Sequence, residues 1–456
     1  MKNHLNKFAV VLLTTLIFSN TLLIASSDIQ NISEIIQFKI DIDKSAVGVA
    51  VVIIEGDKVS FHNFGLTNKQ SKQATTSDSL FEIGSISKTF TSAALASMVK
   101  EGKVKLTDPV QMYLPDDVKM PTKNGKEITL GSLANHSSSL PRLPSNMPYA
   151  DPYDPYADYT IELMYAFLND YELTRDIGEK FEYSNLAVGL LGHVLGLIDN
   201  KPYAQVISER VLKPLKMNNT FVNVPSTYLD KLSDGHDSAL KKTKHWQLPT
   251  LAGAGAIKSS THDMALYLAA NINGTPLADA IILSRMQSID FGADGPKIGL
   301  AWLQKEYSKG TYYWHNGGTG GFRTFIGFDP KNKKGMVILE NSANGMDDIG
   351  NAYFFDSLEQ LKSETLNVVK IGESKLKLLN GEYELVPGFI ITITNEGEQL
   401  IIQATGQPKI PFKAKSAIEF INKGVQARIT FETDDKGNAL SMTLYQGGQV
   451  LKGDKQ

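Results

Sequence analysis

The chain has 456 residues, of which 42% are hydrophobic, and a formal net charge of −3 at neutral pH. This length exceeds one typical core, so two or three domains are expected. The small net charge excludes the strongly basic surface that nucleic acid requires, and it favours small or neutral partners. Because the sequence contains no cysteine, disulfides, thiol catalysis and thiol-linked lipids are also excluded.

Residues 1–27 have the pattern of an export signal. Lys2 and Lys7 precede a mostly apolar run from Phe8 to Ala25, which ends in small residues. Polar residues interrupt the run and favour a cleaved signal over a retained membrane anchor. We therefore expect an exported protein, either periplasmic or secreted, without a stable membrane span after the signal is removed.

The next segment predicts a β-hairpin followed by a helix. Residues 46–54 form an apolar run typical of a buried strand, and a turn signal separates them from a second strand near 59–65. Residues 86–100 are apolar at helical spacing, and Phe81 to Gly84 precede them. Ser85 is therefore expected in the first turn or at the N-cap of this helix.

The middle of the chain predicts a helical subdomain inserted into an α+β domain. Helical patterns dominate residues 130–217, and strand patterns return near 311–314, 322–328 and 335–340. A loop rich in Pro, Tyr and Asp at 147–160 is interpreted as a solvent-exposed connector, with substrate selection above the active cleft as the alternative.

Short alternating runs from about residue 376 predict a separate all-β module, in the form of a small barrel. The runs span residues 389–394, 400–404, 417–421, 425–433 and 439–445. The expected domains are therefore 28–365 and 372–456.

The Ser-x-x-Lys pattern at Ser85 and Lys88 contains a candidate nucleophile. A serine hydroxyl needs a neighbouring base or positive charge for activation, and residues three apart on a helix share one face. Burial would lower the pKa of Lys88 and make it a proton acceptor. The same pattern begins at Ser97, Ser238 and Ser374, but only the first copy follows a strand and opens a helix. A serine cap beside a surface lysine is the alternative.

Two further patterns supply complementary chemistry. Tyr183 and Asn185 form a Tyr-x-Asn sequence in which the phenol can shuttle protons and the amide can bind a substrate amide. His315 precedes Gly317 and Gly318, which would let a substrate backbone lie close to a strand and free an N–H for an oxyanion hole. The alternatives are a turn before a helix for the first pattern, and a phosphate loop or hairpin turn for the second.

In this order the three elements resemble the penicillin-recognising serine hydrolases, which include class C β-lactamases, D-alanyl-D-alanine carboxypeptidases and esterases. Residues 128–142, 251–267, 298–302 and 325–341 also look like landmarks of that family, and 121–142 is most similar to AmpH-type carboxypeptidases and endopeptidases. The resemblance implies a transpeptidase-like antiparallel sheet flanked by helices, and an accessory C-terminal β-barrel.

The resemblance also implies a role for each site residue. Ser85 would be the acylated nucleophile, activated by Lys88, and Tyr183 would exchange protons with the leaving group and the deacylating water. Asn185 would bind the substrate amide, together with the strand that carries His315 and Gly317. Backbone N–H groups of Ser85 and Gly318 would form the oxyanion hole. No cofactor or metal is implied.

The sequence departs from the family pattern at three places. His315 stands where β-lactamases usually have lysine, and a neutral imidazole binds a substrate carboxylate less strongly than a permanent cation. Arg323 is a candidate replacement for that charge, with an ordinary surface arginine as the favoured alternative. The usual His-Thr-Ser-Gly-Leu is His136 to Leu140 without glycine, and the usual Pro-Gly is Ile177-Gly178. We expect altered loops with the chemistry kept.

The leading hypothesis is an exported, penicillin-binding D-Ala-D-Ala carboxypeptidase or D-amino-acid peptidase that works through a Ser85 acyl-enzyme. Its substrates would be β-lactams, D-amino-acid peptides or peptidoglycan. A class C-like β-lactamase and a serine esterase are the alternatives within the enzyme class. A non-catalytic protein that binds cell-wall peptide is the alternative of another class.

Overall fold

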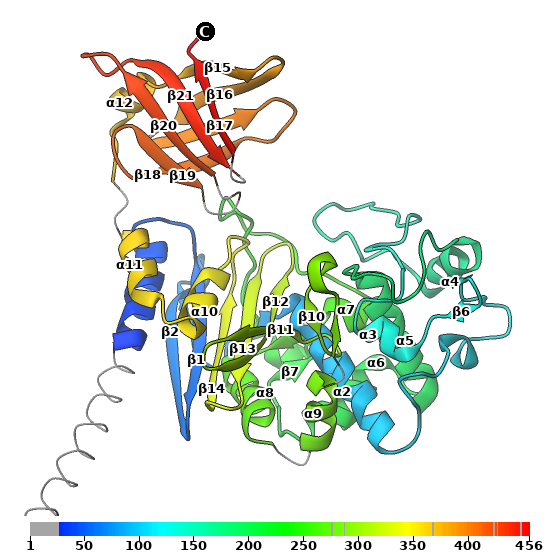
Figure 1. Cartoon of the computed structure of the whole chain (residues 1–456). Coiled ribbons are helices and arrows are strands. Elements are labelled where there is room, and N and C mark those ends of the chain that lie inside the picture. Colours follow the sequence, from blue (N-terminus) through cyan, green and yellow to red (C-terminus); the bar gives the residue numbers. More distant parts are fainter. Residues whose placement is uncertain are drawn as a thin grey trace, which may run out of the picture. The chain divides into compact units, whose positions relative to one another are not determined.

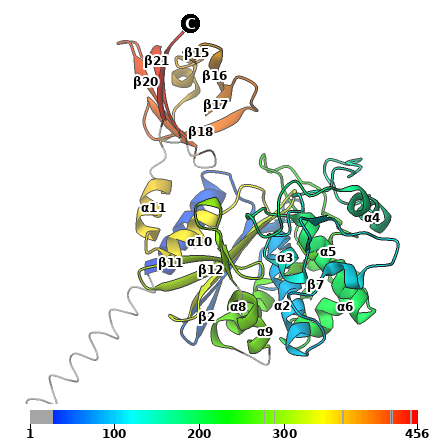
Figure 2. The ribbon, with the colours of Figure 1, turned by 45° about the vertical axis from the view of Figure 1, so that its right-hand side comes forward.

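The computed structural model describes residues 27–274, 277–286, 288–366, 369–422, 425, 427–446 and 449–456. The chain divides into two compact units, one that ends at Leu358 and one that comprises Glu359–Gln456. Each unit has its own sheet and its own apolar core (Figures 1 and 2). The limits of 28–365 and 372–456 remain our proposal for the domains, and the predicted export signal lies outside the described residues except for Ser27.

A nine-stranded antiparallel sheet forms the centre of the first unit, in the order β3-β2-β1-β14-β13-β12-β11-β10-β9. Its strands are β1 (Gly48–Glu55), β2 (Lys58–Asn68), β3 (Gln73–Ala74), β9 (Ile289–Asp290), β10 (Lys297–Ile298), β11 (Leu303–Tyr307), β12 (Gly310–Gly318), β13 (Arg323–Asp329) and β14 (Lys334–Glu340). Strand β1 pairs with β14 from Val49 to Glu55, so distant parts of the chain complete the sheet. The predicted α+β fold is confirmed.

Helices cover both faces of this sheet, which explains why β1 is an unbroken apolar run. Helix α8 (Thr261–Asn273) packs on β1 and β14, and α10 (Asp347–Phe354) packs on β13 and β14 from the other face (Figures 1 and 2). Further helices of this unit are α2 (Ser87–Lys100), α3 (Leu130–Ala134), α4 (Ile161–Asp170), α5 (Asn185–Asp199), α6 (Tyr203–Ile207), α7 (Ala252–Gly255) and α9 (Ala278–Met286), with helical residues at 27–41.

Helix α2 lies in the core of the first unit. Every residue from Ser87 to Met98 is buried, and α2 contacts α5, α7 and α9. A helix that is buried all round needs no polar face, in agreement with its run of small and apolar residues. Short elements connect these helices: β4 (Phe81–Glu82), η1 (Gly84–Ile86), η2 (Val110–Tyr113), β5 (Thr122–Lys123), β6 (Lys126–Glu127), β7 (Thr220–Phe221), η3 (Ser208–Leu212), η4 (Ser226–Lys231), β8 (Lys258–Ser259) and η5 (Gly292–Asp294).

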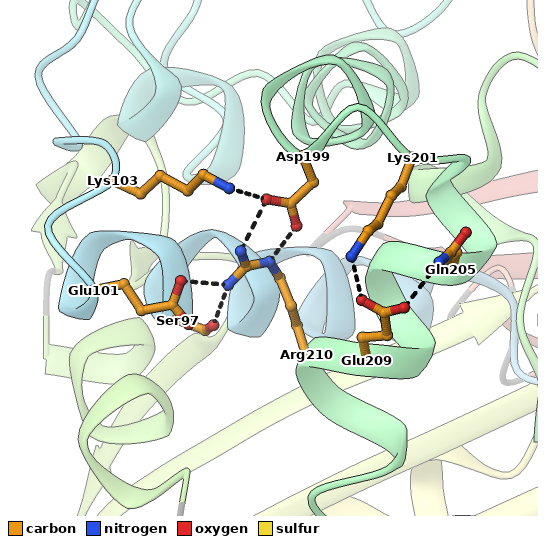
Figure 3. Close-up of polar contacts among 8 residues, drawn as sticks. All are labelled: Ser97, Glu101, Lys103, Asp199, Lys201, Gln205, Glu209 and Arg210. Carbon is orange, nitrogen blue, oxygen red and sulfur yellow. Dashed lines mark hydrogen bonds and ion pairs between the residues drawn. The ribbon is translucent and has the colours of Figure 1, made fainter.

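A polar network holds the C-terminal end of α2 against α5 and η3 (Figure 3). Arg210 donates to both carboxylate oxygens of Asp199, at 2.5 and 2.9 Å, and Lys103 donates to the same carboxylate at 2.5 Å. The Arg210 guanidinium also donates to Ser97 and Glu101, at 3.0 and 2.9 Å. The Ser-x-x-Lys copy that begins at Ser97 is therefore part of a structural network.

The second unit is an eight-stranded antiparallel meander, with each strand paired to the next. Its strands are β15 (Gly381–Val386), β16 (Phe389–Glu396), β17 (Gln399–Ala404), β18 (Ile410–Ala414), β19 (Glu419–Asn422), β20 (Ala427–Thr433), β21 (Ala439–Gln446) and β22 (Gln449–Asp454), accompanied by α11 (Leu358–Leu366) and α12 (Glu373–Lys377). A bridge between Tyr383 and Lys455 joins its two ends, so the sheet is nearly closed. The predicted all-β barrel is confirmed.

Within the ranges that the structure covers, no helix of either unit is long and apolar enough to cross a bilayer.

Candidate active site

Ser85 lies in a 3-10 turn, η1, between the short strand β4 and the buried helix α2. The sequence predicted a first-turn or N-cap position, but the N-cap of α2 is Ile86, and neither η1 nor α2 has a side-chain cap. Gly84 has a φ of 52°, a conformation that L side chains rarely adopt. Because neither helix has a side-chain cap, the Ser85 hydroxyl is not used for capping.

Lys88 points its amine at this hydroxyl from the first turn of α2. Its Nζ donates to Ser85 Oγ at 2.9 Å and to the Ala254 carbonyl of α7 at 2.7 Å. The side chain is completely buried, and burial, followed by the positive charge of Arg142, lowers the pKa of Lys88 well below its ordinary value. Both effects favour the neutral amine, which is the form that accepts a proton.

Tyr183 lies beside the same amine, immediately before α5. Its ring centroid is 4.8 Å from Lys88 Nζ and 5.1 Å from Arg142 Cζ. Burial raises the pKa of Tyr183 to about 12, against the opposing effects of a hydrogen bond with Ser85 and the charge of Arg142. The phenol therefore keeps its proton at neutral pH and is a donor. The helix start is set by Ser184, whose hydroxyl accepts from the Ala187 N–H at 2.9 Å.

Asn185, the first residue of α5, offers a free acceptor beside Tyr183. Its Nδ2 donates to the Tyr156 hydroxyl at 3.0 Å, whereas its buried Oδ1 has no hydrogen-bond partner among the residues that the structure describes. Tyr156 is 6% exposed and packs against Trp246, with ring centroids 5.2 Å apart. The interpretation of residues 147–160 as a solvent-exposed connector is therefore wrong at this point, because the aromatic ring is buried and its hydroxyl is needed by Asn185.

Strand β12 brings His315 and the two glycines alongside η1. A side chain at Gly317 would begin 2.0 Å from the Ile83 carbonyl oxygen, and one at Gly84 would begin 2.5 Å from the Gly318 nitrogen. Only glycine allows backbones to lie this close, so the Gly318 N–H is held next to the turn that carries Ser85.

His315 is buried in the same region and does not provide a cation. Its side chain is 1% exposed, its ring centroid is 6.3 Å from that of Tyr183, and its Nδ1 lies 2.6 Å from the Asn316 carbonyl. Burial, followed by the charge of Lys88, lowers the pKa of His315 to about 3. The imidazole is therefore neutral at pH 7.

Arg323 lies on the other face of the sheet. It alternates along β13 with Thr324, whose hydroxyl donates to the Ile83 carbonyl at 2.8 Å. The Arg323 guanidinium donates to the carbonyls of Thr319 and Phe322, at 2.7 and 2.9 Å. The structure thus uses Arg323 to hold the β12–β13 connection and does not bring it together with Ser85.

His136 belongs to the site, although the sequence interpretation treated its loop as structural only. Its ring stacks on Tyr183 with centroids 4.5 Å apart, and its Nδ1 accepts from the Ser184 N–H at 3.1 Å. Ser139, at the position of the family's glycine, has a φ of 63° and donates to the Asp176 carbonyl at 2.7 Å. This hydrogen bond helps to hold a backbone conformation that glycine adopts without strain.

Arg142 is a second residue that sequence reasoning missed, although it closes the run from Ile128 that resembles a landmark of the family. Its carbonyl accepts from the N–H groups of Asn185 and Leu186, at 2.9 and 3.3 Å, so the backbone is fixed to the start of α5. Its guanidinium lies over the Tyr183 ring. A search for charge beside Tyr183 would have singled it out.

The arrangement can support acyl transfer. A hydroxyl, an amine whose pKa is lowered by burial and a protonated phenol lie together, and a glycine N–H lies beside them. Across the described stretches of the chain, no three His, Cys, Asp or Glu side chains gather as a candidate metal site.

The sequence matches one protein family and several of its characterised members. The sequence model of the family described as Beta-lactamase matches residues 29–357. A beta-lactamase from Pseudomonas fluorescens is 28% identical over 64% of this chain and 88% of its own length. The D-alanyl-D-alanine-carboxypeptidase/endopeptidase AmpH of Escherichia coli K12 is 28% identical over 67% of this chain and 84% of its own length.

Two solved structures share the fold. The beta-lactamase/D-alanine carboxypeptidase from Yersinia pestis, complexed with citrate, has a TM-score of 0.64 at 27% identity and covers 76% of this chain and 99% of its own. The beta-lactamase/D-alanine carboxypeptidase from Pseudomonas syringae has a TM-score of 0.63 at 22% identity, with 73% and 99% coverage.

Proposed function

Because the chain belongs to the beta-lactamase family of serine hydrolases, we propose that it is a D-Ala-D-Ala carboxypeptidase or D-amino-acid peptidase acting through a Ser85 acyl-enzyme. The observation that carries this proposal is the 2.9 Å contact between Lys88 Nζ and Ser85 Oγ, made by an amine that is completely buried. A buried amine with a lowered pKa, in hydrogen-bond contact with a hydroxyl, is positioned to act as a general base.

Acylation follows from this contact. Lys88 takes the proton of Ser85 as Oγ attacks the carbonyl carbon of the substrate amide. The resulting oxyanion lies between the N–H groups of Ser85 and Gly318, each of which stabilises it by about 3 kcal/mol. The carbon–nitrogen bond then breaks, and Tyr183, protonated because its pKa is about 12, gives its proton to the leaving amine.

Deacylation reverses the roles with water in place of the amine. Water attacks the ester carbonyl and gives a proton to the Tyr183 phenolate that acylation left. The ester bond to Ser85 then breaks as the protonated amine of Lys88 returns its proton to Oγ. The unpaired Oδ1 of Asn185 accepts from an N–H of the substrate backbone, which holds the acyl part during both steps.

The neutral His315 favours a peptidase over an efficient β-lactamase. Its pKa of about 3 leaves no positive charge at the position where β-lactamases of this family usually carry lysine. We therefore expect β-lactams to acylate Ser85 and to leave slowly. We also propose that the protein is exported, since peptides with D-amino acids belong to the cell wall.

The proposal is tested with a fluorescent penicillin and a D-Ala-D-Ala peptide. Wild type is expected to form a covalent adduct that maps to the peptide containing Ser85, to keep it for hours, and to release D-alanine. Ser85→Ala is expected to lose both activities.

Ser87→Ala is the matched control, because Ser87 is buried two positions away and its hydroxyl accepts from the Ile257 N–H instead. It should still be labelled. An adduct that survives in Ser85→Ala, or a wild type that neither binds penicillin nor hydrolyses any acyl substrate, rejects the proposal. Rapid turnover of penicillin without peptide hydrolysis would identify a β-lactamase instead.

A further inference from the structure

Arg142 is a cation without a counterion at the candidate active site. Within the described parts of the chain its guanidinium has no carboxylate within ion-pair distance, and its side chain donates no hydrogen bond. Each of the other arginines beside this region is engaged, since Arg323 donates to two carbonyls and Arg175 pairs with Glu182. A guanidinium keeps its charge in proteins, so this charge is permanent.

The position of Arg142 is fixed by the backbone rather than by its side chain. Its carbonyl accepts from the N–H groups of Asn185 and Leu186, which ties it to the first turn of α5. The guanidinium carbon then lies 5.1 Å from the centroid of the Tyr183 ring, and Lys88 Nζ lies 4.8 Å from the same centroid. The charge is therefore held beside the proposed reacting groups, with its donors unused.

Other basic groups around Ser85 do not provide this charge. Lys88 is buried, and its amine is occupied by Ser85 and the Ala254 carbonyl. His315 is buried and neutral. Of the three basic residues Lys88, His315 and Arg142, Arg142 thus supplies the permanent positive charge beside the reacting groups.

From this geometry we propose that Arg142 binds a carboxylate of the substrate and thereby selects acidic peptides. This inference rests on the proposed function for the identity of the bond that is cut. A guanidinium presents parallel N–H donors that match a carboxylate, and such charge-assisted pairs are stronger than neutral hydrogen bonds. A carboxylate can come from the C-terminus of the leaving residue or from an acidic side chain on the acyl part.

The experiment compares pairs of peptides that differ only in charge. One pair ends in D-Ala-D-Ala as the free acid or the carboxamide, and the other carries glutamate or glutamine on the acyl side. Each peptide competes with a neutral ester substrate, and the inhibition constants are measured for wild type, Arg142→Gln, Arg142→Lys and Arg323→Gln. The full chain is used throughout.

In wild type, the acidic peptide of one pair is expected to bind about tenfold to a hundredfold more tightly than its neutral partner. In Arg142→Gln, the ratio of the two inhibition constants of that pair should be close to one. The pair that changes identifies the source of the carboxylate. Arg142→Lys should keep part of the ratio, and Arg323→Gln should keep all of it. Any effect of Arg142 on the protonation of Lys88 changes the rate of ester hydrolysis. Because the same ester is used with both peptides of a pair, that effect does not change the ratio of their inhibition constants.

An Arg142→Gln variant that keeps the wild-type ratios, or a wild type that binds acid and neutral peptides equally, overturns the inference. The competition assay needs only that the ester is hydrolysed and that the peptides bind. If the peptides inhibit but are never cut, the proposed peptidase function fails while the role of Arg142 is still measured.

Discussion

At the N-terminal end of α2, Lys88 and the neighbouring Arg142 face no carboxylate in the part of the chain that the structure describes, whereas at the C-terminal end Lys103 and Arg210 both pair with Asp199. Figure 3 shows the second arrangement, in which Arg210 reaches Asp199 on one side and Glu101 on the other. Basic side chains thus lie without a paired carboxylate at one end of this buried helix, and they are paired with carboxylates at the other end.

The difference follows from what each end has to do. Pairing lowers the pKa of Asp199 to about 2, chiefly through its hydrogen bonds with Arg210 and, after the opposing effect of burial, with Lys103. A carboxylate beside Lys88 would instead raise the pKa of that amine and keep it protonated, so it would be lost as a base. The absence of a counterion near Lys88 is consistent with catalysis, and the paired network supplies stability away from it.

The largest expected effect comes from Lys88→Met, which keeps the buried volume of the side chain and removes its amine. Without a general base at 2.9 Å from Ser85, the rate of acylation by fluorescent penicillin should fall by about a hundredfold to ten-thousandfold. The rate is followed by gel fluorescence under single-turnover conditions.

Lys100→Met is the control for this variant, because it makes the same change at an exposed position of the same helix. It should acylate at the wild-type rate. Tryptophan fluorescence checks that both variants fold. If Lys88→Met folds and is acylated as fast as Lys100→Met, the amine is not the base and the contrast between the two ends of α2 has no catalytic meaning.

The next largest effect is expected from Arg210→Met at the other end. Arg210 and Asp199 are 12% and 6% exposed, so removing the guanidinium leaves a mostly buried carboxylate with Lys103 as its remaining cation. The free energy of unfolding should fall by about 3 kcal/mol. The three tryptophans, Trp246, Trp302 and Trp314, all lie in the first unit, so their fluorescence in urea reports that unit alone.

Lys201→Met provides the matched comparison within Figure 3, because Lys201 and Glu209 form an ion pair whose side chains are 38% and 34% exposed. Its loss should change the free energy of unfolding by no more than about 1 kcal/mol. Equal losses for the two variants would mean that the burial of Arg210 and Asp199 does not set the strength of their pairing. Penicillin acylation should survive in both folded variants.

Much of the fold was predictable because its signals are local. The apolar runs at 46–54 and 335–340 predicted β1 and β14, and strands at both ends of the unit predicted that distant segments complete one sheet. The short strands β15, β18 and β22 were not identified among the alternating runs of the second unit. A proline at position 411 interrupts the strand signal in β18, since proline is depleted in strands.

The candidate site was predictable to the extent that its contacts are local or carried by a motif. Ser85 and Lys88 are three residues apart, so their contact follows from helical geometry. The contact between Asn185 and Tyr156 joins a helix to a loop without a motif, and it was missed. The unpaired state of Arg142 depends on which acidic residues the fold keeps away, and no local pattern contains that information.

The smallest expected effect is a change of stability with pH at the paired end. The ordinary pKa of an aspartate is 3.8 and that of Asp199 in the folded protein is about 2, so its pairing contributes fully above pH 3.8 and is lost as the pH falls towards 2. At pH 6 wild type should therefore be more stable than Asp199→Asn, and the difference should be smaller at pH 3. Urea unfolding followed by tryptophan fluorescence measures the free energy of unfolding of both proteins at each pH. A difference that stays constant or grows on acidification would show that Asp199 stabilises the network through its shape rather than its charge, because only the charged form responds to pH.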